Sequence, residues 1–471
     1  MPNTPPIAPP SIGSGRIVGS STIPCDKVDI KITEVEWLES YTRVCQQDKP
    51  IANWKVWKSS TSMTTTQVNS DDFFYQDCSD NPAVYFIRSS SMANHKKIKL
   101  KVRLKTVCGS ALPISTSGNK AKLILSFGNK KFISNEFSLP AKDDEESVIL
   151  EGNIDQISWL ISPTFSLEYE DNDTAMTKNS LFSEKIPLEA FVLYDEPAKF
   201  YKKGVWVEVL RFLFKNTDIN NDQDTVVSAG KIAKYCHSEH GMVYEAVNGK
   251  SSYFSFDFHI PYFMDESNKG EFELRGYLSK TKYGLFGSTK KKNIVNCYDQ
   301  AAAVQSLCGA LGIISKWIYM KPVGYIKTTN LVGIGSCNNP FYKSNNSNKV
   351  ESRLFGKPGE GTIRMAFDNH VFVRLKETGI ILDATIGPYI GDKSVLEYAN
   401  EVLDIKVNFK FNQRIAKILG ARTPPEESVY PKPLTELPLT LEAIEKSFKG
   451  KYKGHEHTRG YPLKGVSKIV W

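Results

Sequence analysis

The sequence predicts a multidomain protein in which an all-β region, arranged as one or two β-sandwiches, precedes an α+β domain. Three observations support this prediction. The chain has 471 residues, which is too long for a single hydrophobic core. Between residues 26 and 195 apolar and polar residues alternate with period two, and from residue 196 apolar residues recur at helical spacing.

The composition is that of a globular protein without concentrated charge. The net charge is +8 and 41% of the residues are hydrophobic, so we expect no nucleic-acid partner. No apolar stretch reaches the roughly 18–20 residues of a membrane-spanning helix. The cysteines form no C-x-x-C pair, which argues against a zinc ribbon, and their even number permits disulfides among the first four as readily as free thiols. These cysteines are Cys25, Cys45, Cys78, Cys108, Cys236, Cys297, Cys308 and Cys337.

Residues 1–25 are rich in Pro, Ser and Gly and predict a flexible leader. The segment lacks the charged and apolar regions of a signal peptide. We therefore expect a cytoplasmic protein, or one exported by a route that needs no standard signal.

The region 26–195 is predicted to be β. Apolar residues alternate with polar ones in residues 28–32 and 98–105, and further strands are expected at 121–127, 132–139 and 165–169. Turns are expected at Gly128-Asn129 and Gly152-Asn153. The Lys/Arg stripe of residues 98–105 is interpreted as a solvated sheet face, with an acidic partner as the alternative.

Helices are expected in the following region, at residues 206–214, 226–237 and 272–282. Two histidine clusters, 236–240 and 455–457, look superficially like metal ligands. We interpret the first as the end of a helix and the second as a surface tail within a C-terminal extension, residues 401–471.

The candidate catalytic residues are Cys297, His370 and Asp383. Cys297 begins an Ala-rich helical stretch, His370 begins a strand-like run, and Asp383 ends the next one. In such an arrangement a carboxylate orients the imidazole, the imidazole activates the thiol, and the thiolate attacks a carbonyl. A helix N-terminus favours the thiolate because its unpaired N–H groups and dipole stabilise negative charge.

In order and local sequence these residues resemble the transglutaminase-like superfamily, with its papain-like Cys-His-Asp site, in its bacterial type. The matching blocks are 296–313, with its Leu-Gly-Ile ending, 370–375 and 381–385, where Ala384 replaces the family's Pro. The resemblance implies a transglutaminase-like catalytic domain over residues 196–400, with Cys297 as nucleophile, His370 as base and acid, and Asp383 as orienting carboxylate. No Trp lies between Trp206 and Cys297, and the only Gln there is Gln223, so the backbone N–H of Cys297 is the remaining oxyanion donor.

The function implied is thioester-mediated acyl transfer from a peptide or side-chain amide of a protein substrate, without cofactor or metal. Hydrolysis, by a protease or deamidase, is favoured over cross-linking of Gln to Lys. The alternative is a non-catalytic binding or structural module. The architecture would also suit a delivered toxin or effector that contacts a secretion or injection machinery. Residues 336–361 are expected to form either a rim of the active-site cleft or a disordered insertion.

Overall fold

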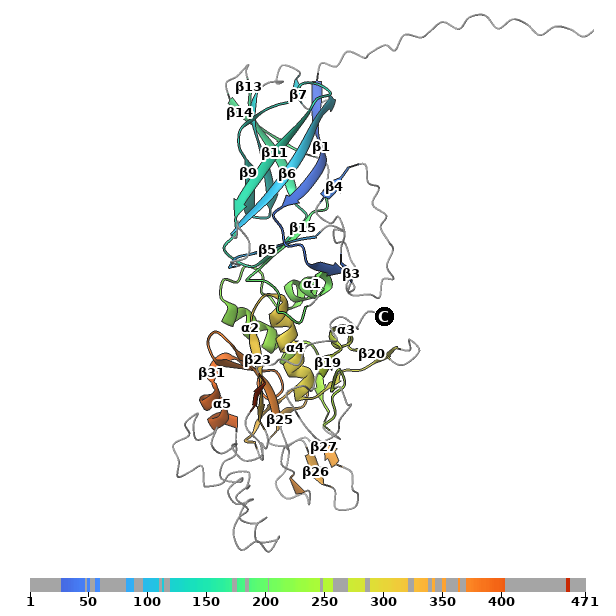
Figure 1. The fold of residues 1–471 in the computed structure, drawn as a ribbon, viewed down its shortest axis with the longest axis vertical. Helices are drawn as coiled ribbons and strands as arrows, with labels where there is room; N and C mark the ends of the chain where they lie inside the picture. Colours follow the sequence, from blue (N-terminus) through green and yellow to red (C-terminus); the bar gives the residue numbers. More distant parts are fainter. Residues whose placement is uncertain are drawn as a thin grey trace, which may run out of the picture.

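A computed structural model gives the arrangement of the chain (Figure 1). It describes residues 27–46, 49–50, 56–59, 82–88, 96–109, 112–113, 119–171, 176–182, 186–201, 203–245, 249–256, 270–283, 289–320, 326–337, 341–343, 350–352, 363–364, 370–402 and 455–457. The predicted leader and nearly all of the predicted C-terminal extension lie outside these residues.

A curled, ten-stranded antiparallel sheet forms most of the N-terminal region (Figure 1). Its strand order is β14-β13-β8-β9-β11-β6-β1-β4, with β10 on β8 and β7 on β1. The strands are β1 (Lys27–Leu38), β4 (Val56–Lys58), β6 (Lys97–Cys108), β7 (Leu112–Pro113), β8 (Lys120–Phe127), β9 (Lys130–Ser134), β10 (Phe137–Ser138), β11 (Glu145–Asn153), β13 (Thr164–Asp171) and β14 (Met176–Leu181). The predicted strands are confirmed, but they join one continuous sheet where the sequence suggested one or two sandwiches.

The Lys/Arg stripe of β6 lies on the partly exposed face of this sheet, opposite the buried Leu100 and Val102. Its cations face glutamates of neighbouring strands. The Lys99 Nζ lies 3.8 Å from an oxygen of Glu151, and the Arg103 guanidinium lies 3.8 Å from an oxygen of Glu34. Exposed pairs of this kind stabilise a fold little, but they offset the positive charge of the stripe.

The turn predicted at Gly152-Asn153 is wrong, because both residues belong to β11. Gly152 is needed there for close packing. A Cβ at this position would lie 2.2 Å from the Phe132 ring, which is buried against the strand. The turn predicted at Gly128-Asn129 is present between β8 and β9, and Gly128 has a φ of +59°.

Two smaller sheets connect this region to the first helix. They are β12-β15-β5, in which β15 and β5 run parallel, and β16-β2-β3. Their strands are β2 (Val44–Gln46), β3 (Lys49–Pro50), β5 (Pro82–Phe86), β12 (Ser158–Ile161), β15 (Glu189–Leu193) and β16 (Val205–Trp206), followed by the predicted helix, α1 (Val207–Asn216). A buried ion pair joins β15 to α1: Arg211 donates to both oxygens of Glu189, at 2.9 and 2.5 Å. Trp159 of β12 donates to the same carboxylate at 2.9 Å.

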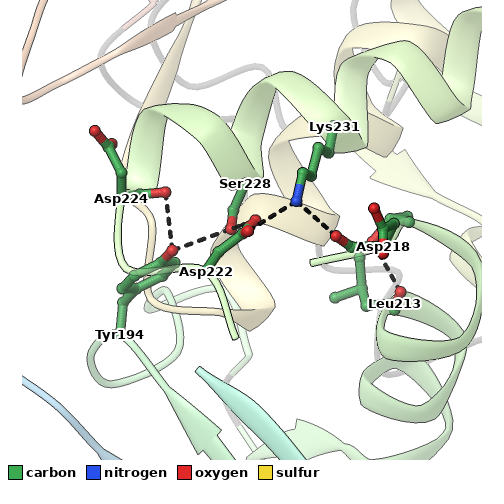
Figure 2. Close-up of polar contacts among 8 residues, drawn as sticks. Tyr194, Leu213, Asp218, Asp222, Asp224, Ser228 and Lys231 are labelled. Atoms are coloured by element: carbon green, nitrogen blue, oxygen red, sulfur yellow. Dashed lines mark hydrogen bonds and ion pairs between the residues drawn. The ribbon is translucent and has the colours of Figure 1, made fainter. Parts of the chain in front are cut away.

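A polar network fixes the start of helix α2 (Thr225–Lys234) to Tyr194, the residue after β15 (Figure 2). The Tyr194 hydroxyl donates to the carbonyl of Asp224 at 2.8 Å and lies 3.0 Å from the Ser228 hydroxyl. Ser228 donates to one oxygen of Asp222, and Lys231 donates to the other at 2.7 Å. Since α2 packs on the C-terminal sheet, the network ties the N-terminal region to that sheet.

The second main sheet has five strands in the order β31-β30-β29-β23-β32. Helix α4 packs on β23 and β29, whereas α2 and α5 contact β30 and β31. The elements are α4 (Cys297–Ala310), β23 (Ser315–Met320), β29 (His370–Leu375), β30 (Ile380–Asp383), β31 (Tyr389–Ser394), α5 (Val395–Val402) and β32 (His455–His457).

Gly312 makes the connection from α4 to β23. Its φ is +80°, and a Cβ on it would lie 2.3 Å from the carbonyl oxygen of Asp195. Only glycine meets both requirements without strain. At the Leu-Gly-Ile ending of the helix, the chain therefore turns and also packs closely against the backbone of Asp195.

The remaining elements are short. They are the π-helix η2 (Tyr235–Glu239), α3 (Leu274–Ser279) and the strands β17 (Val243–Tyr244), β18 (Phe254–Phe256), β19 (Gly270–Phe272), β20 (Thr281–Tyr283), β21 (Thr289–Lys291), β22 (Ile294–Val295), β24 (Thr329–Leu331), β25 (Gly335–Cys337), β26 (Phe341–Lys343), β27 (Val350–Ser352) and β28 (Ile363–Arg364).

Several of these elements bear on predictions. The helix expected at 226–237 is α2 followed by η2, and the one expected at 272–282 is only α3, because Lys280 adopts a left-handed conformation that ends it. Within the expected loop 336–361, the described residues lie in the strands β25, β26 and β27. Within the described part of the chain, no helix is long and apolar enough to cross a membrane.

Candidate active site

Cys297 is the first residue of α4, and the preceding residue fixes where this helix begins. The Asn296 side chain accepts hydrogen bonds from the N–H groups of Tyr298 and Asp299, at 3.0 and 3.2 Å. In return, the Asp299 carboxylate accepts from the Asn296 N–H at 3.1 Å. This capping box holds the Cys297 thiol at the positive end of the helix dipole.

The sequence did not indicate the second role of Asp299. Its fully buried carboxylate also accepts from the N–H groups of Ser252, Tyr253 and Phe254, at 2.8, 2.9 and 2.6 Å. Burial raises the pKa of Asp299 to about 6, against the opposing effect of these backbone hydrogen bonds. Asp299 is therefore mostly ionised at neutral pH. Its carboxylate anchors the segment 252–254 beside helix α4.

His370 and Asp383 meet because β29 and β30 are antiparallel neighbours. The start of one strand therefore lies beside the end of the other. His370 Nε2 lies 2.8 Å from Asp383 Oδ2, and Cys297 lies close enough to the same imidazole to help raise its pKa. Since Asp383 occupies Nε2, Nδ1 is the nitrogen left for the thiol. The structure thus brings the three candidate residues into one chain of contacts.

The three side chains are almost completely enclosed. Cys297 and His370 are each 4% exposed and Asp383 is 1% exposed. Burial alone lowers the pKa of His370. The charge and hydrogen bond of Asp383, together with Cys297, outweigh that effect and raise the pKa to about 10. This raised pKa favours the protonated imidazole at neutral pH.

Asp383 is held by more than His370. Its Oδ1 accepts from the N–H groups of Thr385 and Ile386, at 2.7 and 3.4 Å. Its Oδ2 also accepts from the hydroxyl of Tyr398 at 2.6 Å. Sequence reasoning missed Tyr398. Ser394 and Glu397 form an S-x-x-E capping box, a pattern that predicts a helix start and so places Tyr398 in the first turns of α5.

Gln300, one turn after Cys297, is a second residue that the sequence did not single out. It is fully buried. Its amide donates to the carbonyls of Cys236 and Ala384, at 3.0 and 3.1 Å, and accepts from the Tyr277 hydroxyl at 2.6 Å. Helix α4 is thereby joined to the residue that follows Asp383 at the end of β30.

His237 and His240 each contact a backbone carbonyl. His237 Nε2 lies 3.0 Å from the carbonyl of Asn330, and His240 Nε2 lies 2.9 Å from that of Tyr277. Burial raises the pKa of Cys236 to about 12, and Cys308 is a fully buried free thiol. Among the first four cysteines, Cys45 is free and Cys108 is disulfide-bonded. No cluster of three metal-ligating side chains occurs among the described residues. That statement does not cover the side chains of residues 455–457, which are not described.

Comparison with known proteins gives distant structural similarities. No protein-family model and no curated protein matches the sequence. The structure is similar to red sea bream transglutaminase, with 12% identity and a TM-score of 0.32, over 64% of this chain and 49% of that one. The chain thus spans about half the length of that transglutaminase. It is also similar to the N-terminal domain of PorA, with 11% identity and a TM-score of 0.14, over 24% of this chain and 84% of that one.

Proposed function

We propose that the protein is a cysteine-dependent acyl-transfer enzyme that acts on a peptide or side-chain amide through a thioester. The observation that supports the proposal is the buried pair of His370 and Asp383 beside Cys297, with Cys297 as the first residue of a capped helix. Cysteine enzymes combine a thiol at such a position with an oriented imidazole.

In the proposed reaction, Cys297 Sγ attacks the amide carbonyl carbon, and the backbone N–H of Cys297 stabilises the developing oxyanion. The Nδ1 proton of His370 then passes to the departing nitrogen. The C–N bond breaks, an amine leaves and a thioester remains. Asp383 keeps the imidazole oriented throughout.

The second half of the reaction decides the product. Water, deprotonated by His370 as it attacks, breaks the C–S bond and gives a carboxylate, which corresponds to proteolysis or deamidation. A lysine amine at the same step gives a cross-link. We favour hydrolysis because it requires only one protein substrate.

A second candidate is a non-catalytic binding or structural module. The near-complete enclosure of Cys297 favours this reading, since a substrate carbonyl can reach the sulfur only after neighbouring segments move. In such a module the Cys297, His370 and Asp383 contacts would only stabilise the domain.

Iodoacetamide labelling across pH, with peptide mapping, tests the proposal. Cys297 should be alkylated well below the ordinary thiol pKa of about 8.5, and His370→Ala should abolish this fast reaction. The buried Cys236 and Cys308 serve as internal controls that should react slowly. Slow, His370-independent labelling of Cys297 would favour the structural module.

A further inference from the structure

Oδ2 of Asp383 receives two side-chain donors from different elements. His370 Nε2 of β29 lies at 2.8 Å, and the Tyr398 hydroxyl of α5 donates to it at 2.6 Å. Hydrogen bonds to charged acceptors are short and strong, and two donors on one oxygen share its negative charge. The phenol therefore competes with the imidazole for the same atom.

From this geometry we infer that Tyr398 is a positioning residue of the Cys297, His370 and Asp383 site. Its hydroxyl holds Oδ2 of Asp383 in place and takes up part of its charge, and so sets how firmly His370 keeps its proton. Tyr398 acts through Asp383, and the inference rests on the proposed function.

Tyr398 is suited to this role by its surroundings. Burial, and secondarily Asp383, raise its pKa well above the ordinary value, so the hydroxyl remains a donor over the whole working range. Its ring is clamped by Phe372 and Tyr389, with centroids 4.5 and 4.8 Å away. The ring is therefore held in place without help from its hydroxyl.

Other titratable groups also feel this site. The charge of Asp383 acts on Tyr389 of β31 and His237 of η2, and Cys297 of α4 acts on the imidazole. Tyr389 provides a matched control. Its hydroxyl donates to Glu401 at 3.1 Å and not to the Asp383 carboxylate, and its ring packs against Tyr398.

The test compares Tyr398→Phe with Tyr389→Phe in the full chain, following the titration of the His370 ring carbon by NMR. That resonance is assigned by its absence in His370→Gln. Without the phenol, the undivided charge of Oδ2 faces the imidazolium, so the pKa of His370 should rise by about 0.5–1 unit in Tyr398→Phe. It should stay unchanged in Tyr389→Phe. An unchanged or lowered value in Tyr398→Phe overturns the inference.

A second variant covers the case in which Tyr398→Phe does not fold. Incorporating 3-fluorotyrosine at position 398 preserves the hydroxyl but makes it more acidic and a stronger donor, so the His370 pKa should move downward. An absence of movement overturns the inference. Iodoacetamide labelling separates the two ideas: an unreactive Cys297 in the wild type refutes the proposed function, whereas a reactive Cys297 with no effect at Tyr398 refutes only this inference.

Discussion

Gln300 donates a hydrogen bond to the carbonyl of Ala384 at 3.1 Å, and this bond joins helix α4 to the residue that follows Asp383. The relative position of thiol and carboxylate is therefore set by a buried amide as well as by the sheet. Three polar groups depend on that amide.

Gln300→Met should lower the free energy of unfolding by about 3 kcal/mol, because two carbonyls and a hydroxyl lose their buried partner. It should also slow iodoacetamide labelling of Cys297. Urea unfolding measures the first effect. Gln305→Met is the control, since Gln305 lies on the same helix, is also buried and, among the described residues, donates only to the Ser315 carbonyl, at 3.2 Å. A loss of about 1 kcal/mol is expected there. Equal losses in the two variants would contradict this assignment.

Arg211→Met should destabilise the protein by about 3–5 kcal/mol, because the Glu189 carboxylate, 1% exposed, would be left without its cation. The double variant Glu189→Gln with Arg211→Met removes the charge and keeps an acceptor for Trp159. It should recover most of that loss in urea unfolding. A double variant as unstable as the single one would show that the arginine acts mainly through packing.

Gly312→Ala should be far more harmful than Gly379→Ala. Both glycines have positive φ, +80° and +74°, but a Cβ meets the Asp195 carbonyl at 2.3 Å only at Gly312. A Cβ on Gly379 would have no atom of the described residues within 4 Å. Only the left-handed backbone would then lower the stability of Gly379→Ala, by about 1 kcal/mol. For Gly312→Ala we expect about 3 kcal/mol or more, measured by chemical unfolding. Similar values for both would rule out the close contact.

Lowering the pH should destabilise the protein through His240. Its Nε2 faces the Tyr277 carbonyl and its Nδ1 lies 3.2 Å from the Tyr235 hydroxyl, so the neutral ring has both partners. Burial lowers the pKa of His240 from 6.5 to about 4. The unfolded chain therefore binds the proton more readily, and stability is lost as the pH falls from 6.5 through 4.

The expected loss is about 3 kcal/mol of unfolding free energy across that window. His240→Gln retains a donor and an acceptor but does not titrate, so its stability should depend less on pH there. Parallel pH profiles for the two proteins would exclude His240 as the source.

Local patterns predicted much of the fold. Period-two alternation located β1 and β6, and the apolar run after Trp206 located α1. These succeeded because each element buries a face that its own residues specify. The continuous sheet was not predictable, since pairings such as β1 with β6 join residues far apart in sequence.

The candidate site likewise combines residues that local sequence patterns mark with residues whose roles depend on tertiary contacts. Cys297, His370 and Asp383 could be proposed as candidates because each stands at the end of an element and carries a reactive group. Tyr398 and Gln300 resemble ordinary helix residues in sequence, and their roles follow from tertiary contacts with Asp383 and Ala384. A sequence pattern marks the chemistry more readily than the groups that orient it.

The enclosure of Cys297 also has a consequence for chemical damage. An ionised and accessible sulfur reacts with peroxide and disulfide reagents, and only 4% of Cys297 is accessible. Oxidation of Cys297, like its alkylation by iodoacetamide, should therefore depend on how often neighbouring segments move away from the sulfur. The movement that admits a substrate would at the same moment expose the sulfur to oxidants.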